Sequence, residues 1–529
     1  MKFRRIVGIL PSWKSALLAV LGGFLLVLAF PDFDLWFLAW FALVPLLIAV
    51  DREKESAPRS FVCGWLFGFT FFIGSCWWLT YAPIHYAGFP VVLAYFLLCI
   101  VTAIVGVFPG LFALSQSYLV NRFGYGAILL APMLWVAFEF ARYWISGNDW
   151  NAIAYSQAFN GDLVGLAAVG GIYLSSVPVL CLSALAGYLL ITWKQRFEKG
   201  AVHNLGLVCY AILILLSPMI SSEFNGDMNF SSGPPYVVAV QPNVPMAGLD
   251  EDKWRELRQH HIEQAEGALA NINEKRGTNS ELPAIVVLPE SPMNFMWGED
   301  LEFQQFMKAF AARNNVSVLF NSAEPDRPNH KYFNSAVMID PSGHEVAEYD
   351  KIYLLPFGEA VPVPLDSLIP GFVGNFSYGR NYNLVPVGDA KAGIMICFES
   401  HFGQLSREYV RRGVDVIIEM TNDGYLGPTP VLRQHLANAV FRAIETNRPV
   451  LRVTNVGITA YITPQGEVLE ATQPYTEDTR VWSVAKSDGR ETFYVWFGDW
   501  FAWLCSAVTI LMLIGGWLRR SGGRAETRV

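Results

Sequence analysis

Residues 393–400 of this 529-residue chain read GIMICFES, and this stretch decides the fold expected for the second half of the chain. An apolar run followed directly by Cys397 and, two residues later, by Glu399 is typical of a buried strand that stops where polar residues begin. The stretch IVVLPES at 285–291 has the same form, with Glu290 just after the apolar run. Both stretches predict strands that present polar or reactive side chains at their ends.

On both sides of these stretches, short β-branched runs alternate with segments of helical spacing, from about residue 233 to residue 490. The runs expected as strands are 236–240, 285–288, 316–320, 336–339, 393–396, 416–418 and 450–453. The segments expected as helices are 252–274, 301–313, 402–412 and 431–446. Alternating strands and helices indicate an α/β layered fold. The polar residues 221–232 are expected to form a linker that leads into it.

The rest of the chain is strongly apolar. The whole sequence is 53% hydrophobic and 16% charged, and the charged residues concentrate in the predicted α/β domain. A helix needs about 20 apolar residues to cross the hydrocarbon core of a bilayer. Candidate runs lie near 12–30, 35–50, 60–80, 90–119, 126–145, 163–192, 204–220 and 495–518. We therefore expect a multi-span α-helical membrane domain at 1–220 with about seven helices, an eighth helix at 495–518 and a cytoplasmic tail at 519–529.

Lysine and arginine are distributed unevenly between these runs. They lie before the first run and after the second, fourth, sixth and eighth, whereas the loops 31–34, 81–90 and 146–162 contain none. The positive-inside rule then predicts that both termini are cytoplasmic and that the domain at 233–490 is extracytoplasmic. The net charge of −8, without a basic stripe, argues against a nucleic-acid partner.

Cys397 is the one cysteine of seven that lies in the predicted α/β domain. The others lie in apolar runs, where cysteine usually behaves as a small hydrophobic residue: Cys63, Cys76, Cys99, Cys181, Cys209 and Cys505. Cys397 therefore has no disulfide partner within its domain, and no Cys/His spacing indicates a zinc site.

The stretch AEYDKIYLLPFGE at 347–359 adds Lys351 to the carboxylate and the thiol. A glutamate can take the thiol proton, and a lysine charge favours the thiolate and the oxyanion that forms later. Each residue alone has a commoner explanation, because most charged side chains face solvent and most buried cysteines are inert packing. The combination is what suggests nucleophilic chemistry.

The stretches LPES, YDKIYLLPFGE and ICFES resemble the three Glu–Lys–Cys motifs of the carbon–nitrogen hydrolase, or nitrilase, superfamily in order and spacing. With eight expected spans, the resemblance narrows to the bacterial apolipoprotein N-acyltransferase family and covers essentially the whole chain. Further similar stretches are VQPNVP at 240–245, TND at 421–423 and the segment 433–462. The resemblance implies an αββα sandwich for the α/β domain.

The resemblance also implies roles for individual residues. Glu290 resembles the general base, Lys351 the lysine that stabilises the oxyanion, and Cys397 the acylated nucleophile. Glu359 and Glu399 fall where the family has supporting carboxylates that orient the lysine and hold the loop after the cysteine. No metal and no cofactor are implied.

Two positions depart from the family pattern. Phe398, beside the nucleophile, is expected to be a supporting residue but stands where tyrosine is frequent, and Tyr425-Leu426 replaces an aromatic pair. Weaker correspondences suggest substrate-binding residues at Trp254, Asn334, Asn422 and Asp423.

The activity implied by the resemblance is a two-step acyl transfer in the bacterial inner membrane. A phospholipid acyl donor would form a thioester, and a diacylglyceryl-modified apolipoprotein would receive the acyl chain on its α-amino group. Two alternatives stay open at this point. One is a membrane-tethered nitrilase-type amidase with water as the acceptor, and the other is a transporter or scaffold whose α/β domain has lost catalysis.

The apolar, Gly- and Pro-rich segment 361–380 is expected to be either a mobile lid or a buried irregular loop. Glu139 and Arg142 stand at i and i+3 in the fifth run, so they form either a polar site in the bilayer or, as we expect, a pair that holds helices together.

Other polar residues are expected to carry no chemistry. His260-His261 are adjacent, which suits chelation poorly, and we expect solvent exposure. Ser291 lacks the setting of a nucleophile elbow, and Gly424 and Gly427 lack the lysine of a phosphate-binding loop.

Overall fold

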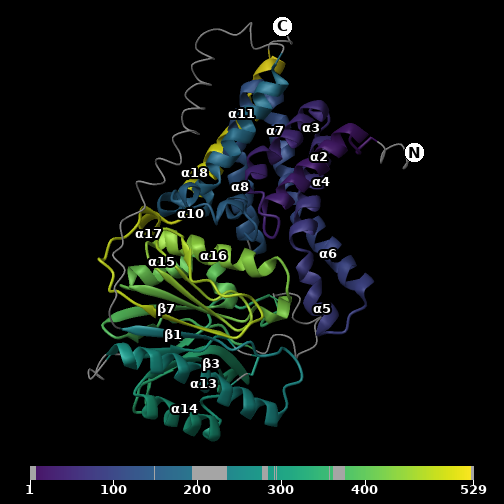
Figure 1. Ribbon diagram of the computed structural model, residues 1–529. Helices are drawn as coiled ribbons and strands as arrows, with labels where there is room; N and C mark the ends of the chain where they lie inside the picture. Colours follow the sequence, from purple (N-terminus) through teal and green to yellow (C-terminus); the bar gives the residue numbers. More distant parts are fainter. Residues whose placement is uncertain are drawn as a thin grey trace. The chain divides into compact units, whose positions relative to one another are not determined.

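The computed structural model describes residues 8–147, 149–193, 235–276, 284–290, 292–293, 295–356, 358–361 and 376–525. The chain forms two compact units, one built from residues up to 225 together with 497–529 and the other from 226–496. The first unit is helical and the second contains the sheets (Figure 1). The expected span at 204–220, the expected linker at 221–232 and Ser291 lie outside the described residues.

The first unit consists of helices joined by short loops, as the apolar runs predict. Its α-helices are α2 (Trp13–Ala29), α3 (Ala39–Glu53), α4 (Ala57–Ser75), α5 (Tyr81–His85), α6 (Val91–Val105), α7 (Val107–Phe123), α8 (Ala131–Ser146), α9 (Gly161–Val164), α10 (Ala167–Ser175), α11 (Val177–Ile191) and α18 (Trp500–Ala525). Its short 3-10 helices are Trp36–Leu38, Trp77–Thr80, Tyr125–Leu130 and Ile153–Gln157.

Among the described residues, four helical segments are long and apolar enough to cross a membrane: Val91–Phe123, Tyr125–Ser146, Ala167–Ile191 and Trp500–Arg519. The helices Ala57–Ser75 and Trp77–His85 qualify as a pair that is bent by 61°. These segments coincide with five of the expected spans. At the first two expected spans, α2 and α3 contain 17 and 15 residues, fewer than the ~20 that a straight crossing needs.

A break divides the longest of these segments. α6 ends at Val105 and α7 begins at Val107, so the break lies at Gly106. Proline has no N–H, and its ring presses against the carbonyl one turn earlier in the helix. Pro109 therefore disturbs the helix near Val105, which places the break before the proline.

Small residues allow α4 and α7 to pack closely. A Cβ atom added to Gly64 would collide with the backbone carbonyl of Pro109 and would lie 2.6 Å from the Cβ of Ala113. At Gly68 an added Cβ would lie 2.7 Å from Cγ of Pro109. Close packing matters here because apolar helices in lipid gain little from hydrophobic transfer.

Gly64→Ala is expected to lower the unfolding temperature of the detergent-solubilised protein, because the new methyl group forces α4 away from the backbone of α7. The expected loss is about 1–3 kcal/mol, the usual effect of an overpacked contact. Gly126→Ala is the matched control, since an added Cβ there meets nothing within 4 Å. Equal unfolding temperatures of the two variants in a tryptophan-fluorescence melt would contradict the close contact.

Glu139 and Arg142 on α8 bind the loop that follows this helix. Oε1 of Glu139 accepts hydrogen bonds from the backbone N–H of Ile153 at 3.0 Å and from Nε1 of Trp135 at 3.2 Å. Nη1 of Arg142 donates to the carbonyl of Trp150 at 2.9 Å. These contacts support a structural role for Glu139 and Arg142. They differ from the expected pair between helices, because the two side chains hold α8 to the loop that follows it and do not form a direct ion pair.

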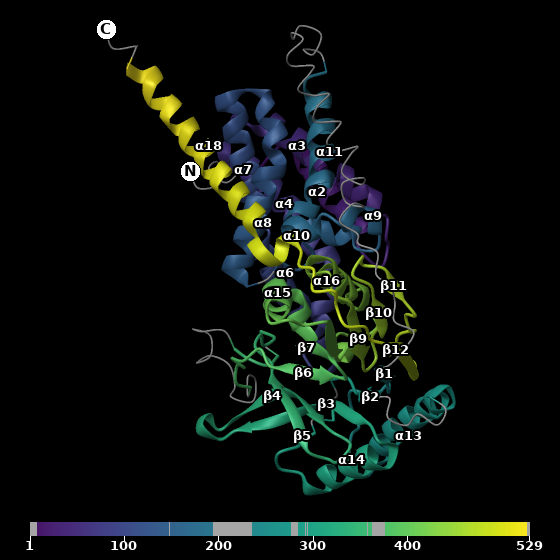
Figure 2. The same cartoon turned by 90° about the vertical axis from the view of Figure 1, so that its left-hand side faces the viewer.

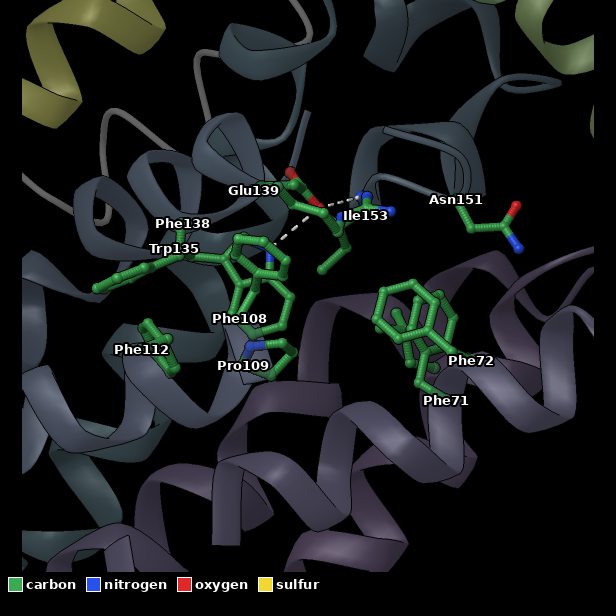
Figure 3. A pocket seen from close by; sticks show the side chains of 12 residues that line it. Phe71, Phe72, Phe108, Pro109, Phe112, Trp135, Phe138, Glu139, Asn151 and Ile153 are labelled. Carbon is green, nitrogen blue, oxygen red and sulfur yellow. Dashed lines mark hydrogen bonds between the residues drawn. The ribbon is translucent and has the colours of Figure 1, made fainter. Parts of the chain in front are cut away.

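A small cavity lies beside Glu139, and half of the residues that line it are aromatic (Figure 3). Its volume is about 20 Å³, which is room for about one water molecule. A cavity of this size cannot admit a lipid or peptide group, so we assign no substrate to it.

The second unit contains two six-stranded sheets, with the orders β12-β1-β2-β3-β4-β5 and β11-β10-β9-β8-β7-β6. The strands are β1 (Tyr236–Gln241), β2 (Ala284–Val287), β3 (Ser317–Asp326), β4 (Lys331–Ile339), β5 (Glu345–Asp350), β6 (Leu384–Val387), β7 (Ala390–Ile396), β8 (Val416–Thr421), β9 (Val450–Thr454), β10 (Ala460–Ile462), β11 (Val468–Leu469) and β12 (Asp478–Ser483). The strands β1, β2 and β3 are parallel to one another, as are β7, β8 and β9.

Helices cover the outer face of each sheet, and the two sheets face each other (Figures 1 and 2). α13 (Glu251–Arg276) and α14 (Leu301–Asn314) cover the first sheet, whereas α15 (Gly403–Arg411) and α16 (Val431–Thr446) cover the second. Alternate residues of β1, Val238 and Val240, belong to the core beneath α13 and α14. The arrangement is the αββα sandwich that the resemblance implies.

All the strands and helices expected from the sequence are present in this unit, which also contains five strands that the sequence pattern does not predict: β5, β6, β10, β11 and β12. β5 and β12 are edge strands, and the sequence of β5, EVAEYD, is mainly polar. Edge strands carry charged residues that discourage pairing with other chains, so they lack the apolar pattern of a central strand.

His261 corrects one expectation of the sequence analysis. His260 is 39% exposed, as expected, but His261 is only 3% exposed. Adjacent residues of a helix point about 100° apart, so His261 turns toward the core that contains Ile262 and Ala265. Burial lowers the pKa of His261 to about 3, which makes it a neutral core residue.

Candidate active site

Three strand ends present Glu290, Lys351 and Cys397. Glu290 follows β2 in the interior of the first sheet, Lys351 directly follows β5 at the edge of that sheet, and Cys397 directly follows β7 of the second sheet. β2 is buried along its whole length. A polar side chain has to lie beyond the end of such a strand, because an unpaired charge inside the apolar core is costly.

Lys351 lies between two carboxylates and is 1% exposed. Its Nζ is 2.8 Å from both oxygens of Glu359 and 3.7 Å from Oε1 of Glu290. Burial alone would lower the pKa of Lys351, but the charges of Glu359 and Glu290 outweigh burial and raise it above its ordinary value. The lysine is therefore a fixed cation beside Glu290.

Asn334 on β4 connects the two carboxylates. Its Nδ2 donates to Oε1 of Glu290 at 2.9 Å and to Oε1 of Glu359 at 2.6 Å. Its own Oδ1 accepts a hydrogen bond from Asn321 at 2.7 Å, which fixes the orientation of the amide. The contacts place Asn334 beside Glu290 and Glu359, where it fixes the orientation of Glu290. A role of Asn334 in binding substrate stays a prediction.

The Cys397 thiol and the Glu290 carboxyl group have perturbed pKa values. Burial raises the pKa of Glu290, and Lys351 opposes that rise. Burial also raises the pKa of the Cys397 thiol well above its ordinary value, and the charge of Glu290 raises it further. At rest the thiol therefore keeps its proton, and the sulfur can attack only if a base removes that proton during the reaction.

Glu399 is fully buried and joins the loop after Lys351 to the strand before Cys397. Its donors are the hydroxyl of Tyr349 and the backbone N–H groups of Ile352, Tyr353 and Ile396, at 2.8, 2.7, 3.0 and 2.9 Å. Burial raises the pKa of Glu399 to about 7, although these hydrogen bonds and Lys351 hold it down. The contacts agree with a supporting role for this carboxylate.

Glu399→Gln is expected to slow the reaction of Cys397 with iodoacetamide by about tenfold, equivalent to about 1.4 kcal/mol. Both oxygens of Glu399 accept hydrogen bonds, so the NH₂ group of a glutamine must face a donor. The rate is measured by mass spectrometry of the Cys397 peptide. Glu467→Gln, at an exposed position, is the control, and a rate equal to that control would remove Glu399 from the supporting residues.

The loop after β8 contacts Glu290 from the second sheet. The backbone N–H of Asn422 donates to Oε2 of Glu290 at 3.1 Å. Asp423, the next residue, is 1% exposed and accepts from Nη2 of Arg452 at 2.8 Å. Burial alone would raise the pKa of Asp423, but Arg452 and His435 lower it to about 2. Asp423 is therefore a buried anion held by cations, which favours support of the site over substrate contact.

The remaining predicted positions are aromatic. Trp254, on α13, packs against the edge of the core, with its ring centroid 6.5 Å from that of Phe295. Phe398 is 7% exposed and packs edge-to-face on Phe402. Tyr425 is 47% exposed. A role of Trp254 in binding substrate stays a prediction.

Most of the segment proposed as a lid, residues 362–375, lies outside the described residues. Its described end is bound to the site. The N–H of Ser377 donates to the carbonyl of Tyr332 at 2.7 Å, and the N–H of Gly379 donates to the carbonyl of Lys351 at 2.8 Å. The residues around Gly379 thus lie directly beside the lysine.

Sequence reasoning missed a group of buried charges that lies next to Asp423. The group comprises Glu419 on β8, His435 on α16 and Arg452 on β9, and each of these side chains is at most 4% exposed. A signal was present in the sequence, because Arg452 interrupts the apolar strand VLRVT. A charge in the middle of a buried strand requires a partner of opposite charge.

The chain was compared with known protein families and structures. Residues 22–185 match the family described as the apolipoprotein N-acyltransferase N-terminal domain, and residues 256–494 match the carbon-nitrogen hydrolase family. The apolipoprotein N-acyltransferase of Geobacter metallireducens is 30% identical to this chain over 523 residues. The alignment covers 96% of this chain and 96% of that protein. That of Pasteurella multocida is 27% identical and covers 95% of this chain and 96% of its own length. Among solved structures, a carbon-nitrogen hydrolase from Helicobacter pylori is 17% identical, covers 47% of this chain and 87% of its own, and has a TM-score of 0.36.

The second unit is thus a carbon–nitrogen hydrolase domain, the class that its sandwich fold and its Glu–Lys–Cys arrangement also define. The similarity to the relatives extends over both units. The chain therefore belongs to the apolipoprotein N-acyltransferase family, as the motifs suggest, and it is a membrane-associated acyltransferase.

Proposed function

We propose that this chain transfers an acyl chain from a phospholipid to the α-amino group of an apolipoprotein's N-terminal diacylglyceryl-cysteine. The observation that carries the proposal is the set of Glu290, Lys351 and Cys397 at three strand ends, with Lys351 buried and the other two partly buried, in a chain of this family. Both reactants are lipids, which accounts for the attachment of a hydrolase-type domain to apolar helices.

In the first half-reaction the sulfur of Cys397 attacks the ester carbonyl carbon of the phospholipid. Glu290 takes the thiol proton, and the ammonium of Lys351 stabilises the oxyanion that forms on the carbonyl oxygen. When the tetrahedral intermediate collapses, the C–O bond breaks. The leaving alkoxide takes the proton from Glu290 and departs as a lysophospholipid, which leaves the acyl chain on Cys397 as a thioester.

In the second half-reaction the α-amino group of the lipoprotein attacks the thioester carbonyl. Glu290 takes a proton from the amine, and Lys351 again stabilises the oxyanion. The C–S bond then breaks, and Glu290 returns the proton to the sulfur. One carboxylate acts as base and then as acid in each half, which requires the fixed position that Asn334 and Asn422 provide.

The proposal places the protein in the bacterial inner membrane, with both termini in the cytoplasm and the carbon–nitrogen hydrolase domain on the extracytoplasmic side. The distribution of lysine and arginine over the loops supports this orientation. Labelling of single cysteines introduced into the loops 81–90 and 519–529 with a membrane-impermeant maleimide tests it, since only the first loop should react in intact spheroplasts.

A membrane-tethered amidase would use the same three residues with water as the acceptor. To separate the two activities, the purified protein is incubated with a phospholipid labelled in its acyl chain and is then given a diacylated lipopeptide. The acyltransferase predicts a hydroxylamine-sensitive adduct on Cys397 that passes to the lipopeptide. An adduct that is discharged only as free fatty acid would establish the hydrolase, and the absence of any adduct would exclude both.

A further inference from the structure

The backbone of Cys397 adopts a conformation that L-residues rarely take. Its φ is +52°, in the left-handed region, where the backbone of a residue other than glycine is strained and is kept only when the surroundings enforce it. The carbonyl of Cys397 accepts hydrogen bonds from Nε2 of His435 at 3.1 Å and from Oγ of Ser400 at 3.3 Å. His435 belongs to α16, so a separate element of the fold holds this strained residue.

Both ring nitrogens of His435 face acceptors. Nδ1 lies 2.7 Å from Oδ1 of Asp423, whereas Nε2 lies 3.1 Å from the Cys397 carbonyl and 3.3 Å from Oε1 of Glu419. Carbonyl and ionised carboxylate oxygens only accept hydrogen bonds. An imidazole that donates from both nitrogens is an imidazolium, so the contacts assign a positive charge to His435.

The charges around His435 balance when it is an imidazolium. Arg452 contacts Glu419 at 2.6 Å through Nη1 and Asp423 at 2.8 Å through Nη2. Two anions thus lie against Arg452 and His435, and all four side chains are nearly inaccessible to solvent. With a neutral His435 the group would carry one uncompensated negative charge in the protein interior, which is strongly unfavourable.

The same contacts join the nucleophile to the base. Asp423, which holds Nδ1 of His435, directly follows Asn422, whose N–H donates to Glu290. His435 therefore lies between the peptide of Cys397 and the loop that fixes Glu290. A shift of the ring would change the position of the sulfur relative to the carboxylate that takes its proton.

We propose that His435 is a positioning residue for the acyl transfer. As an imidazolium held by Asp423, it binds the Cys397 carbonyl and keeps the nucleophile in its left-handed conformation, with the sulfur directed for proton transfer to Glu290. The inference rests on the proposed function only in taking Cys397 as the nucleophile. His435 contacts no reacting atom, and it acts through the peptide of Cys397.

A matched pair of variants tests the proposal. The amide nitrogen of His435→Gln can reach the place of Nε2 and keep the Cys397 carbonyl bond, whereas that of His435→Asn can only replace Nδ1 and keep the Asp423 bond. Both variants remove the same positive charge, so any difference between them reports the contact to Cys397. If they unfold, the pair is made again with Asp423→Asn, which restores the charge balance.

The rate of thioester formation is measured in single turnovers with labelled phospholipid, beside the rate at which iodoacetamide alkylates Cys397. We expect His435→Asn to be slower than His435→Gln by about tenfold in both rates, the effect of losing one hydrogen bond that aligns the nucleophile, with the half-saturating lipid concentration unchanged. Equal rates in the two variants, or a slower His435→Gln, would overturn the proposal. If the unmodified protein forms no thioester, the proposed function fails, and the alkylation rates still decide the role of His435.

Discussion

Cys397→Ala is expected to abolish the acyl adduct and to lower acylation of the lipopeptide by about 10⁴-fold or more, the usual result of removing a catalytic nucleophile. The expectation follows from the position of the thiol, which is partly buried, is acted on by the charges of Glu290 and Lys351, and is activated only by proton transfer. Hydroxylamine-sensitive label on the protein and mass spectrometry of the lipopeptide measure the two steps. Cys99→Ala on α6, which removes a thiol from an apolar helix, is the matched control and should keep full activity.

Cys397→Ser separates the two half-reactions. A serine hydroxyl loses its proton far less readily than a thiol, so the first half should be slowed by several orders of magnitude. Any adduct that forms is an oxygen ester, which resists attack by the amine more than a thioester does. A Cys397→Ser protein that turns over like the unmodified chain would show that sulfur is not the nucleophile and would remove the basis of the proposed function.

The fold was accessible to prediction because its central elements obey simple patterns. β2 and β7 are short apolar runs that end in polar residues, and α16, which lies between β8 and β9, shows helical spacing. Patterns of this kind show which face of a strand or helix is buried, and they can be seen in a single sequence. The polar edge strand β5 escaped prediction because edge position depends on the other strands of the sheet, which no local pattern records.

The candidate site also contains residues that the sequence predicts and residues that it does not predict. Glu290, Lys351 and Cys397 lie at strand ends, and a family resemblance is enough to select them. The ion-pair group of Asp423, His435 and Arg452 joins three elements through side-chain contacts, and which charge meets which carboxylate depends on their packing in three dimensions. For the same reason Glu139 and Arg142, which the helical spacing places on one face, turned out to bind a loop and not each other.

Lys351→Met is expected to slow thioester formation by about 10³-fold, the upper range for loss of one group that stabilises an oxyanion. The substitution keeps much of the length of the side chain but removes the charge that lies between Glu359 and Glu290. The two carboxylates would then face each other through Asn334 without a cation. Leaving a buried charge without its partner typically lowers stability by about 3–5 kcal/mol, so a lower unfolding temperature is expected as well.

The pH dependence of this variant separates its two defects. Lys351 opposes the rise of the Glu290 pKa that burial causes, so its loss should raise that pKa and shift the acidic limb of the rate profile to higher pH. Loss of oxyanion stabilisation alone would lower the rate equally at every pH. Lys391→Met, at an exposed position on β7, controls for the loss of a positive charge and should leave the profile unchanged. A Lys351→Met protein that keeps its rate above the acidic limb would show that the lysine only tunes Glu290 and does not stabilise the oxyanion.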